Sequence, residues 1–239
     1  VQKEISPQIN EATIRLLNRH GVEVVVSKKI RCCGSLNHHL GKEDDAHNDF
    51  KNNINTWYEE YKKGNLDAIL SNTSGCGTTM KDYGFIFRDD KELSKKAKVI
   101  SELTKDISEY IFDSIKLDIK LKEKKYKVAY HSACSMQHGQ KVHNQPISLL
   151  EKTKNEILEI PQGHICCGSA GTYNILQSKI AKKLLEQKVN NIEGLKPDFI
   201  STGNIGCITQ ISHGTKVPIL HTIEVLDWYT GGPKPLVLK

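Results

Sequence analysis

A cysteine pattern occurs twice in this sequence and restricts the possible folds more than any other feature. The second copy comprises Cys134, the segment Cys166-Cys167-Gly168-Ser169 and the pair Gly206-Cys207. The first copy comprises Cys32-Cys33-Gly34-Ser35 and Gly75-Cys76. Sets of thiolates that recur at matched spacing beside glycine are typical of iron–sulfur ligation. We therefore expect a fold that gathers distant cysteines into one site in each half of the chain.

The first copy lacks the cysteine that opens the second. Cys166 follows Cys134 by 32 residues, and the same interval counted back from Cys32 ends immediately before Val1. The sequence also shows neither an initiator methionine nor a basic, apolar leader. We expect this chain to be the C-terminal part of a longer protein. A site in the first half then needs a residue before Val1 or another ligand, or it holds nothing.

Short apolar segments that read as strands alternate with amphipathic helices along the chain. This alternation predicts the α/β class, with mostly parallel sheets and helices on both faces. Loops that follow the carboxyl ends of parallel strands meet at one edge of a sheet, so cysteines in those loops can converge. Strands are predicted at residues 22–26, 67–70, 127–131, 157–160, 198–202 and 217–221. Helices are predicted at residues 6–19, 45–62, 90–98, 101–115, 178–195 and 222–229, with shorter ones that start from the loop 71–77, from about residue 146 and after residue 207.

The duplication predicts two similar three-layer α/β lobes. The chain has 239 residues, of which 38% are hydrophobic, and this is enough for two ordinary cores. The segment 120–127 is charged and lacks apolar periodicity, which marks it as the boundary. We therefore expect a first cysteine-rich domain at residues 1–122 and a second at residues 123–239.

Charge and composition exclude several classes of partner. The formal net charge is +6, but the lysines lie on what read as solvated helix faces and a connecting segment, so no nucleic-acid partner is expected. No stretch approaches the roughly 20 apolar residues that span a bilayer. Seven cysteines without an export signal indicate a reducing compartment. We expect a cytoplasmic protein, at most peripheral on the inner face of the plasma membrane.

The cysteines are the candidate metal ligands, and no catalytic residue is predicted. Four thiolates in the second half suffice for one cluster, whereas the first half supplies three. The adjacent glycines are expected to bind the cofactor by letting the backbone approach it and by presenting N–H groups to sulfur. The predicted ligands are Cys32, Cys33, Cys76, Cys134, Cys166, Cys167 and Cys207, and the predicted cofactor-binding glycines are Gly34, Gly75, Gly168 and Gly206.

Other interpretations of the pattern remain open. Ordinary buried cysteines would not explain two vicinal pairs with the same flanks. Structural zinc usually joins two short knuckles, whereas these ligands lie 30 to 40 residues apart, yet a zinc-stabilised interaction module stays an alternative. Histidines crowd the same loops, and hydrogen bonding to sulfur or backbone is favoured over ligation for them. These histidines are His38, His39, His131, His138, His164, His213 and His221.

Several of these segments resemble the cysteine-rich CCG domains of the glycolate oxidase iron–sulfur subunit family. They are residues 131–140, 166–174 and 203–207 in the second half, and residues 32–39, 74–77 and 81–84 in the first. Related tandem domains occur in lactate-utilisation iron–sulfur proteins and in a heterodisulfide reductase subunit. The family's subunit also carries an N-terminal ferredoxin-like part, which this sequence does not contain.

The resemblance implies an electron-transfer subunit of a complex that oxidises glycolate or another 2-hydroxy acid. Such a subunit receives electrons from FAD-binding subunits and passes them to a quinone-type acceptor. A heterodisulfide-reductase-like or lactate-utilisation oxidoreductase is the alternative. The heterodisulfide reductase pattern ends in CxxC, but Thr73 and Asn204 occupy the first of those positions here. A four-thiolate [4Fe-4S] cluster in the second half is therefore expected, rather than a five-thiolate non-cubane cluster.

Overall fold

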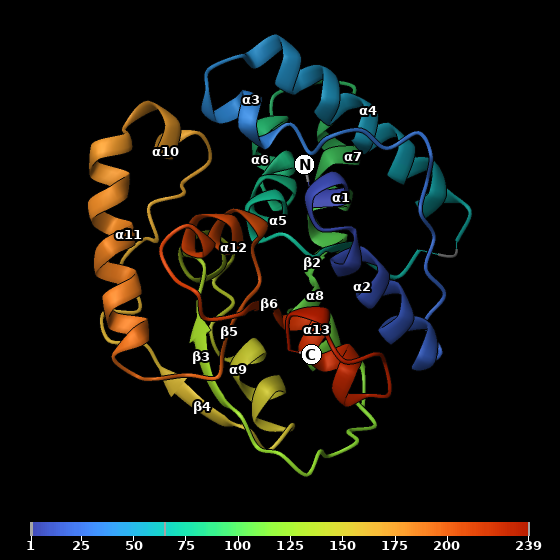
Figure 1. The fold of residues 1–239 in the computed structure, drawn as a ribbon. Coiled ribbons are helices and arrows are strands. Elements are labelled where there is room, and N and C mark those ends of the chain that lie inside the picture. The colour runs from blue at the N-terminus through green and yellow to red at the C-terminus, as the bar shows by residue number, and fades with distance from the viewer. Residues whose placement is uncertain (1, 65, 239) are drawn as a thin grey trace. The chain divides into compact units, whose positions relative to one another are not determined.

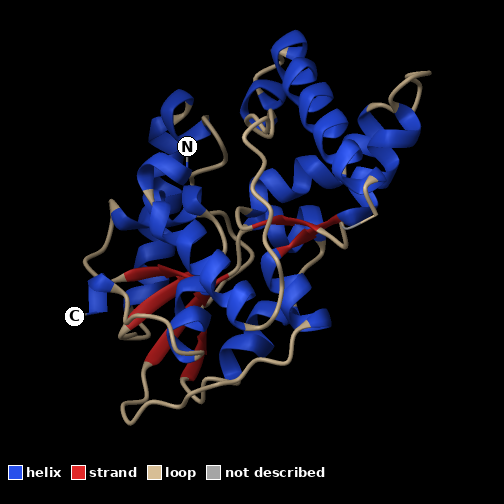
Figure 2. Ribbon diagram, turned by 90° about the vertical axis from the view of Figure 1, so that its right-hand side faces the viewer, coloured by secondary structure: helices blue, strands red, loops and turns tan. Residues whose placement is uncertain are grey.

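The computed structural model describes residues 2–64 and 66–238 and has the α/β fold predicted from the sequence (Figure 1). All of its paired strands run parallel, and helices surround them (Figure 2). The chain divides into two compact units. Unit 1 comprises the residues up to Val24 and those from Ile107 onward, and unit 2 comprises Val25–Asp106.

Unit 1 contains a four-stranded parallel sheet in the order β4-β3-β5-β6. Val128 aligns with Phe199, and His131 aligns with Thr202, which in turn aligns with His221. Four of the five residues in β3 and all four in β5 are buried, as expected for central strands covered on both faces. The strands are β3 (Lys127–His131), β4 (Glu156–Glu159), β5 (Phe199–Thr202) and β6 (Ile219–His221).

Helices cover both faces of this sheet. Ala129 on one face shares a core cluster with Val189 of α11 (Ser178–Glu193), whereas Phe199 on the other face shares a cluster with Val225 of α13 (Thr222–Tyr229). Because side chains alternate between the faces of a strand, the two clusters form separate apolar layers. The principal helices are α9 (Asn144–Glu151), α11 (Ser178–Glu193), α12 (Ile205–Ser212) and α13 (Thr222–Tyr229), and the shorter ones are η1 (Ser135–Gln140), α10 (Tyr173–Leu176) and η2 (Leu236–Leu238).

The N-terminal helix α2 (Pro7–Arg19) belongs to unit 1 although it precedes unit 2 in the sequence. Arg15 and Arg19 reach the carboxylate of Asp227 on α13, with N–O distances of 2.8 and 3.0 Å, and this carboxylate is only 2% exposed. The short helix α1 (Gln2–Ile5) and α8 (Ile107–Ser114) lie in the same unit. The compact units therefore do not coincide with residues 1–122 and 123–239, and that boundary stays a prediction about the sequence repeat.

Unit 2 pairs its two described strands in parallel, with Ile69 opposite Thr104. Its apolar core joins Phe50, Tyr83 and Ile100 from three different helices. The strands are β1 (Ile69–Ser71) and β2 (Thr104–Asp106), and the helices are α3 (Ser35–His39), α4 (Glu43–Lys62), α5 (Ser74–Lys81), α6 (Tyr83–Ile86) and α7 (Ser94–Leu103).

Two sequence predictions about secondary structure are wrong. The segment 22–26 forms no strand, and its Val25 and Val26 side chains are 67% and 72% exposed. Its β-branched residues suit a strand, but no described strand pairs with it, and an unpaired segment gains no ladder hydrogen bonds. The helix predicted over 101–115 is interrupted by β2, where pairing with β1 overrides the helical pattern.

None of the described helices is both long and apolar enough to cross a lipid bilayer. The longest of them, α4, has 20 residues and begins with three acidic side chains in its first turn.

Candidate metal centre

The four cysteines of the second repeat come together in unit 1, beyond the carboxyl ends of the parallel strands. Cys134 follows β3 by three residues and immediately precedes η1. Cys166 and Cys167 lie in the loop between β4 and α10, and Cys207 lies in the first turn of α12. The convergence expected from strand order is therefore present, since all four thiols are linked through neighbouring sulfurs.

Hydrogen bonds link the four thiols in the order Cys134, Cys166, Cys167 and Cys207. Hydrogen bonds from Cys134 and then Cys167 lower the pKa of Cys166 to about 2. A hydrogen bond from Cys167 is the main reason that the pKa of Cys207 falls to about 5. The donors Cys134 and Cys167 show the opposite effect, because each has its pKa raised by its bond to Cys166 and by burial. The four sulfurs are therefore linked in one series of interactions, and a metal could replace their protons.

His131, the last residue of β3, lies at the same site. Its side chain is 1% exposed, its ring nitrogens have no nitrogen or oxygen partner among the described residues, and its interaction with the Cys207 thiol helps to lower the pKa of that thiol. A ring nitrogen of His131 and the sulfurs of Cys167 and Cys207 lie within 4.8 Å of one another. The sequence favoured hydrogen bonding to sulfur or backbone for this histidine, and the structure places its ring beside the sulfurs of Cys167 and Cys207.

Lys188 of α11 is a buried cation beside the sulfurs that sequence reasoning missed. It is 1% exposed, and its Nζ donates to the carbonyl oxygens of Gln162 and Gly163 at 3.3 Å each. Burial lowers the pKa of Lys188, while the four nearby thiols oppose that shift. The signal in the sequence was its position at helical spacing from the buried residues Ala181 and Ile192, on the apolar face of the helix.

Gly168 is required by backbone geometry as well as by its position next to the sulfurs. Its φ of +92° is unfavourable for other residues, and a Cβ added there would lie 2.4 Å from the carbonyl oxygen of Ala181 on α11. Its N–H donates to Cys166 Sγ at 3.3 Å. The N–H of Gly206 instead donates to Asn204 Oδ1 at 2.7 Å, so this glycine takes part in the cap of α12. Their contact with a cofactor stays a prediction.

Unit 2 brings together the three cysteines of the first repeat. Cys33 Sγ donates to Cys76 Sγ at 2.9 Å, and this bond lowers the pKa of Cys76. The hydrogen bond with Cys32 lowers the pKa of Cys33, but the bond to Cys76 and burial outweigh it and raise that pKa to about 12. Cys32 is exposed, and its bond to Cys33 raises its pKa. Three thiols therefore converge, with Cys76 as the thiol most ready to ionise.

The local geometry of unit 2 repeats that of unit 1. Gly34 has a φ of +75°, and a Cβ there would lie 2.4 Å from the ring of Phe50 on α4, just as Gly168 approaches α11. Gly75 and Cys76 are the second and third residues of α5, as Gly206 and Cys207 are in α12. The positive end of the helix dipole favours a thiolate at both positions.

Hydrogen bonds to the backbone hold the first vicinal pair in place. Asn53 Nδ2 donates to the carbonyl oxygen of Cys32 at 2.8 Å, and the Tyr83 hydroxyl donates to that of Cys33 at 2.9 Å. Both side chains belong to helices of unit 2, and Asn53 and Tyr83 are fully buried. The adjacent thiols are thereby fixed relative to the core.

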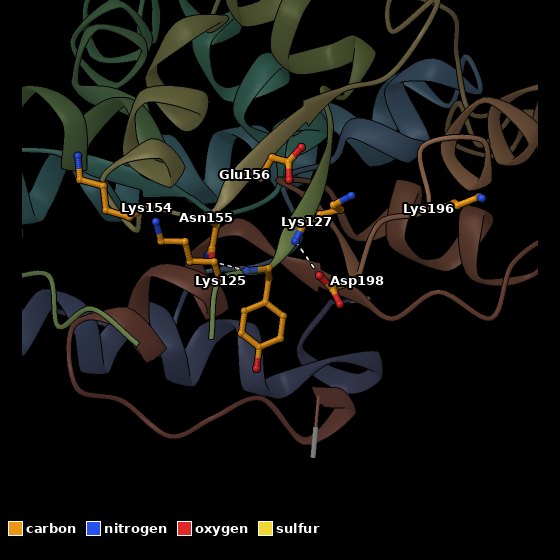
Figure 3. Close-up of a pocket in the computed structure, with 8 residues that line it drawn as sticks. Lys125, Lys127, Lys154, Asn155, Glu156, Lys196 and Asp198 are labelled. Carbon is orange, nitrogen blue, oxygen red and sulfur yellow. Dashed lines mark hydrogen bonds between the residues drawn. The ribbon is translucent and has the colours of Figure 1, made fainter. Parts of the chain in front are cut away.

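A cavity of about 480 Å³ opens at the opposite edge of the unit 1 sheet, where β3, β4 and β5 begin (Figure 3). Four lysines and two carboxylates line it, and the backbone N–H of Lys127 donates to Asp198 Oδ2 at 2.7 Å. Because the cysteines follow the other ends of these strands, this cavity is not part of the candidate metal centre. Its charged lining consists of Lys125, Lys127, Lys154, Lys196, Glu156 and Asp198.

Comparisons with known proteins agree with the duplicated geometry. The model of the CCG cysteine-rich domain family matches residues 1–81 and 128–212. The chain is 34% identical over 226 residues to the glycolate oxidase iron-sulfur subunit of Escherichia coli K12, covering 95% of this chain and 55% of that protein. It is 30% identical over 227 residues to the probable glycolate oxidase iron-sulfur subunit of Bacillus subtilis 168, covering 91% and 50% respectively.

Another relative has a length closer to that of this chain. Lactate utilization protein A of Geobacillus sp. WCH70 is 26% identical over 223 residues, which cover 91% of each protein. In contrast, the chain spans only about half the length of the two glycolate oxidase subunits. The family match covers both cysteine repeats and most of the residues that form the two thiol clusters. The chain therefore belongs to the CCG cysteine-rich domain family.

Proposed function

We propose that unit 1 binds an iron–sulfur cluster through Cys134, Cys166, Cys167 and Cys207, and that the chain carries electrons within an oxidoreductase complex. The observation that carries this proposal is the convergence of four thiols from three separate strand ends. When bound, such a cluster would store and release single electrons. The residues around it determine how readily it does so.

The residues present suit an iron–sulfur cluster in three respects. Cys166 and Cys207 already favour the thiolate form that iron requires. The Gly168 N–H donates to sulfur, an interaction that stabilises a reduced cluster. Lys188 supplies a buried positive charge near four sulfurs, which balances the negative charge of thiolates and sulfide. Zinc would use the same thiolates but would transfer no electrons.

The cluster proposed for unit 1 is a [4Fe-4S] cluster with four cysteine ligands. Asn204, at the position that would be cysteine in a CxxC pattern, accepts hydrogen bonds from the N–H groups of Gly206 and Cys207 and caps α12. It therefore supplies no fifth thiolate, which supports electron transfer over disulfide chemistry at the cluster. In unit 2, Cys32, Cys33 and Cys76 could hold a second cluster only with a further ligand.

The proposed complex oxidises a 2-hydroxy acid, with glycolate as the leading substrate. Support comes from the names of the relatives, which are iron-sulfur subunits of glycolate oxidase and proteins of lactate utilization. In this proposal FAD-binding subunits deliver electrons to the chain and a quinone-type compound accepts them. The proposed location is the cytoplasm, with at most peripheral membrane contact.

Anaerobic reconstitution with iron and sulfide tests the proposal. We expect a brown protein that contains iron and acid-labile sulfide in equal amounts and gives an EPR signal in one of its redox states. A Cys134→Ser variant should lose most of the bound iron and sulfide. The neighbouring change Ser135→Ala removes no thiol and should leave both in place. A colourless wild-type protein that binds zinc but no reducible iron would refute electron transfer and favour the interaction module.

A further inference from the structure

His131 and His221 are two buried histidines with different environments in the same row of the unit 1 sheet. The strand register aligns both with Thr202 of β5, so they lie on either side of it. Each side chain is 1% exposed. The ring of His221 caps α13, since its Nδ1 accepts a hydrogen bond from the N–H of Ile223 at 3.1 Å. The ring of His131 caps no described helix and interacts with the thiol of Cys207.

A buried imidazole without a hydrogen-bond partner destabilises a protein, because its nitrogens lose water and gain nothing in return. Neither ring nitrogen of His131 has a nitrogen or oxygen partner among the described residues, and the ring interacts with the thiol of Cys207. The ring instead lies with Cys167 and Cys207, and the three potential ligand atoms are all within 4.8 Å of one another. Such spacing is compatible with ligands that share one metal ion, and imidazole and thiolate commonly occur together around iron and zinc.

We propose that His131 is a nitrogen ligand of the metal centre in unit 1, acting together with Cys167 and Cys207. This inference rests on the proposed function and changes its ligand set: a [4Fe-4S] cluster takes one protein ligand per iron, so His131 would bind one iron in place of one of the four cysteines. The cysteine pattern alone does not reveal this donor. A neutral ring nitrogen donates its lone pair to the metal, and the other nitrogen keeps its proton. Replacing or supplementing thiolate with neutral imidazole raises the reduction potential of an iron–sulfur centre.

The neighbouring polar groups do not offer the same ligand. Asn204 uses its side-chain oxygen to cap α12, and Lys188 donates to two backbone carbonyls of the loop before Cys166. His164, two residues before Cys166, is exposed. His131 thus combines burial, position at a strand end and proximity to two sulfurs.

Pulsed EPR on the reconstituted chain, with ¹⁵N-labelled histidine, tests the proposal directly. The reduced wild-type centre should show the strong coupling of a metal-bound nitrogen. His131→Gln should abolish that coupling, and the matched buried control His221→Gln should retain it. His131→Cys should keep the iron, lose the coupling and have a lower reduction potential. Absence of strong coupling in wild type, or its persistence in His131→Gln, would overturn the assignment of His131 while leaving the iron–sulfur proposal intact.

Cobalt(II) alone provides a second readout that needs no cluster assembly. His131→Gln should weaken cobalt binding at least about tenfold and alter the visible absorption bands, whereas His221→Gln should change neither. Circular dichroism of the metal-free variants will show that both are folded. Wild type that assembles no cluster would defeat the proposed function, and the cobalt comparison would then still decide the role of His131. Equal cobalt affinity and equal spectra for wild type and His131→Gln would rule out His131 as a metal ligand.

Discussion

Unit 1 and unit 2 share their local backbone geometry but differ in the chemistry gathered around it. In both, a glycine with positive φ follows a vicinal cysteine pair and packs closely on a long helix, and another cysteine occupies the third residue of a short helix. Unit 1 adds Cys134, His131 and Lys188, whereas unit 2 has three cysteines. The repeated segments therefore position the thiols in both units, while residues outside the repeat complete the site in unit 1.

We expect the two units to differ most in the iron that each binds. Cys207→Ser removes one of four converging thiols in unit 1 and should eliminate the main iron–sulfur signal after reconstitution. Cys76→Ser, its counterpart in unit 2, should leave that signal largely unchanged. Iron and acid-labile sulfide assays on both variants measure the difference. If Cys76→Ser abolished the signal and Cys207→Ser preserved it, the assignment of the principal site to unit 1 would be wrong.

Alanine at the two matched glycines should destabilise both units, and unit 1 more strongly. Gly168→Ala places a Cβ against the Ala181 carbonyl, a backbone group that cannot rotate away, and adds strain at positive φ. We expect a loss of about 3 kcal/mol in unfolding free energy. Gly34→Ala meets mainly the Phe50 ring, which can shift slightly, so its loss should be smaller. Chemical denaturation of the metal-free variants provides the measurement, and a smaller loss for Gly168→Ala would contradict this ranking.

Removing the buried carboxylate of Asp227 should affect unit 1 alone. Asp227→Asn leaves Arg15 and Arg19 without their anionic partner, at an expected cost of roughly 3 kcal/mol. Hydrogen exchange should show faster opening of α2 and α13, with unchanged protection in α4. Equal loss of protection in α4 would mean that the two compact units do not unfold separately.

Lys188 is a buried lysine beside the thiols of unit 1, and this makes it a probe of the electrostatics of that site. Lys188→Met should lower the reduction potential of the unit 1 cluster, because a positive charge that favours the more negative reduced state is lost. An effect on the order of 1–2 kcal/mol at an effective dielectric of 20 corresponds to roughly 40–90 mV for one electron. Redox titration checks this, with Lys182→Met on the exposed face of α11 as the control. An unchanged potential would exclude an electrostatic role.

The smallest effect concerns pH and the helix α13 of unit 1. Burial raises the pKa of Glu224 above its ordinary value of 4.5, so the folded state binds its proton more tightly than the unfolded state does. This group therefore favours folding most at low pH and loses that contribution as the pH rises through its folded pKa. Glu224→Gln keeps an acceptor for the His221 N–H and should be relatively more stable than wild type above this range. Denaturation at several pH values tests the sign, which a lower stability at neutral pH would contradict.

Strand positions and cysteine convergence could be predicted because both follow from local patterns. β3 covers the predicted residues 127–131, and the rule for parallel strands brings Cys134 and Cys207 to the same edge. The sequence could not predict that the segment 22–26 forms no strand or that β2 interrupts a helix, because both depend on whether a neighbouring strand is available for pairing. The close packing of Gly168 on α11 also depends on the tertiary fold.

Lys188 and His131 lie beside the thiols, and their positions could be identified only from the structure. Lys188 occupies the apolar face of its helix, but only the fold shows that this face lies next to sulfur. His131 is one of ten histidines, and the sequence does not show which of them is buried beside the cysteine sulfurs.

X-ray absorption at the iron edge of the reconstituted chain shows directly which atoms surround the iron. If the unit 1 thiols hold an iron–sulfur cluster, the spectrum will show iron surrounded mainly by sulfur, with a second shell of neighbouring iron, and Cys207→Ser will remove that second shell. Iron bound only by oxygen and nitrogen, with no neighbouring iron, would show that the unit 1 thiols hold no iron–sulfur cluster.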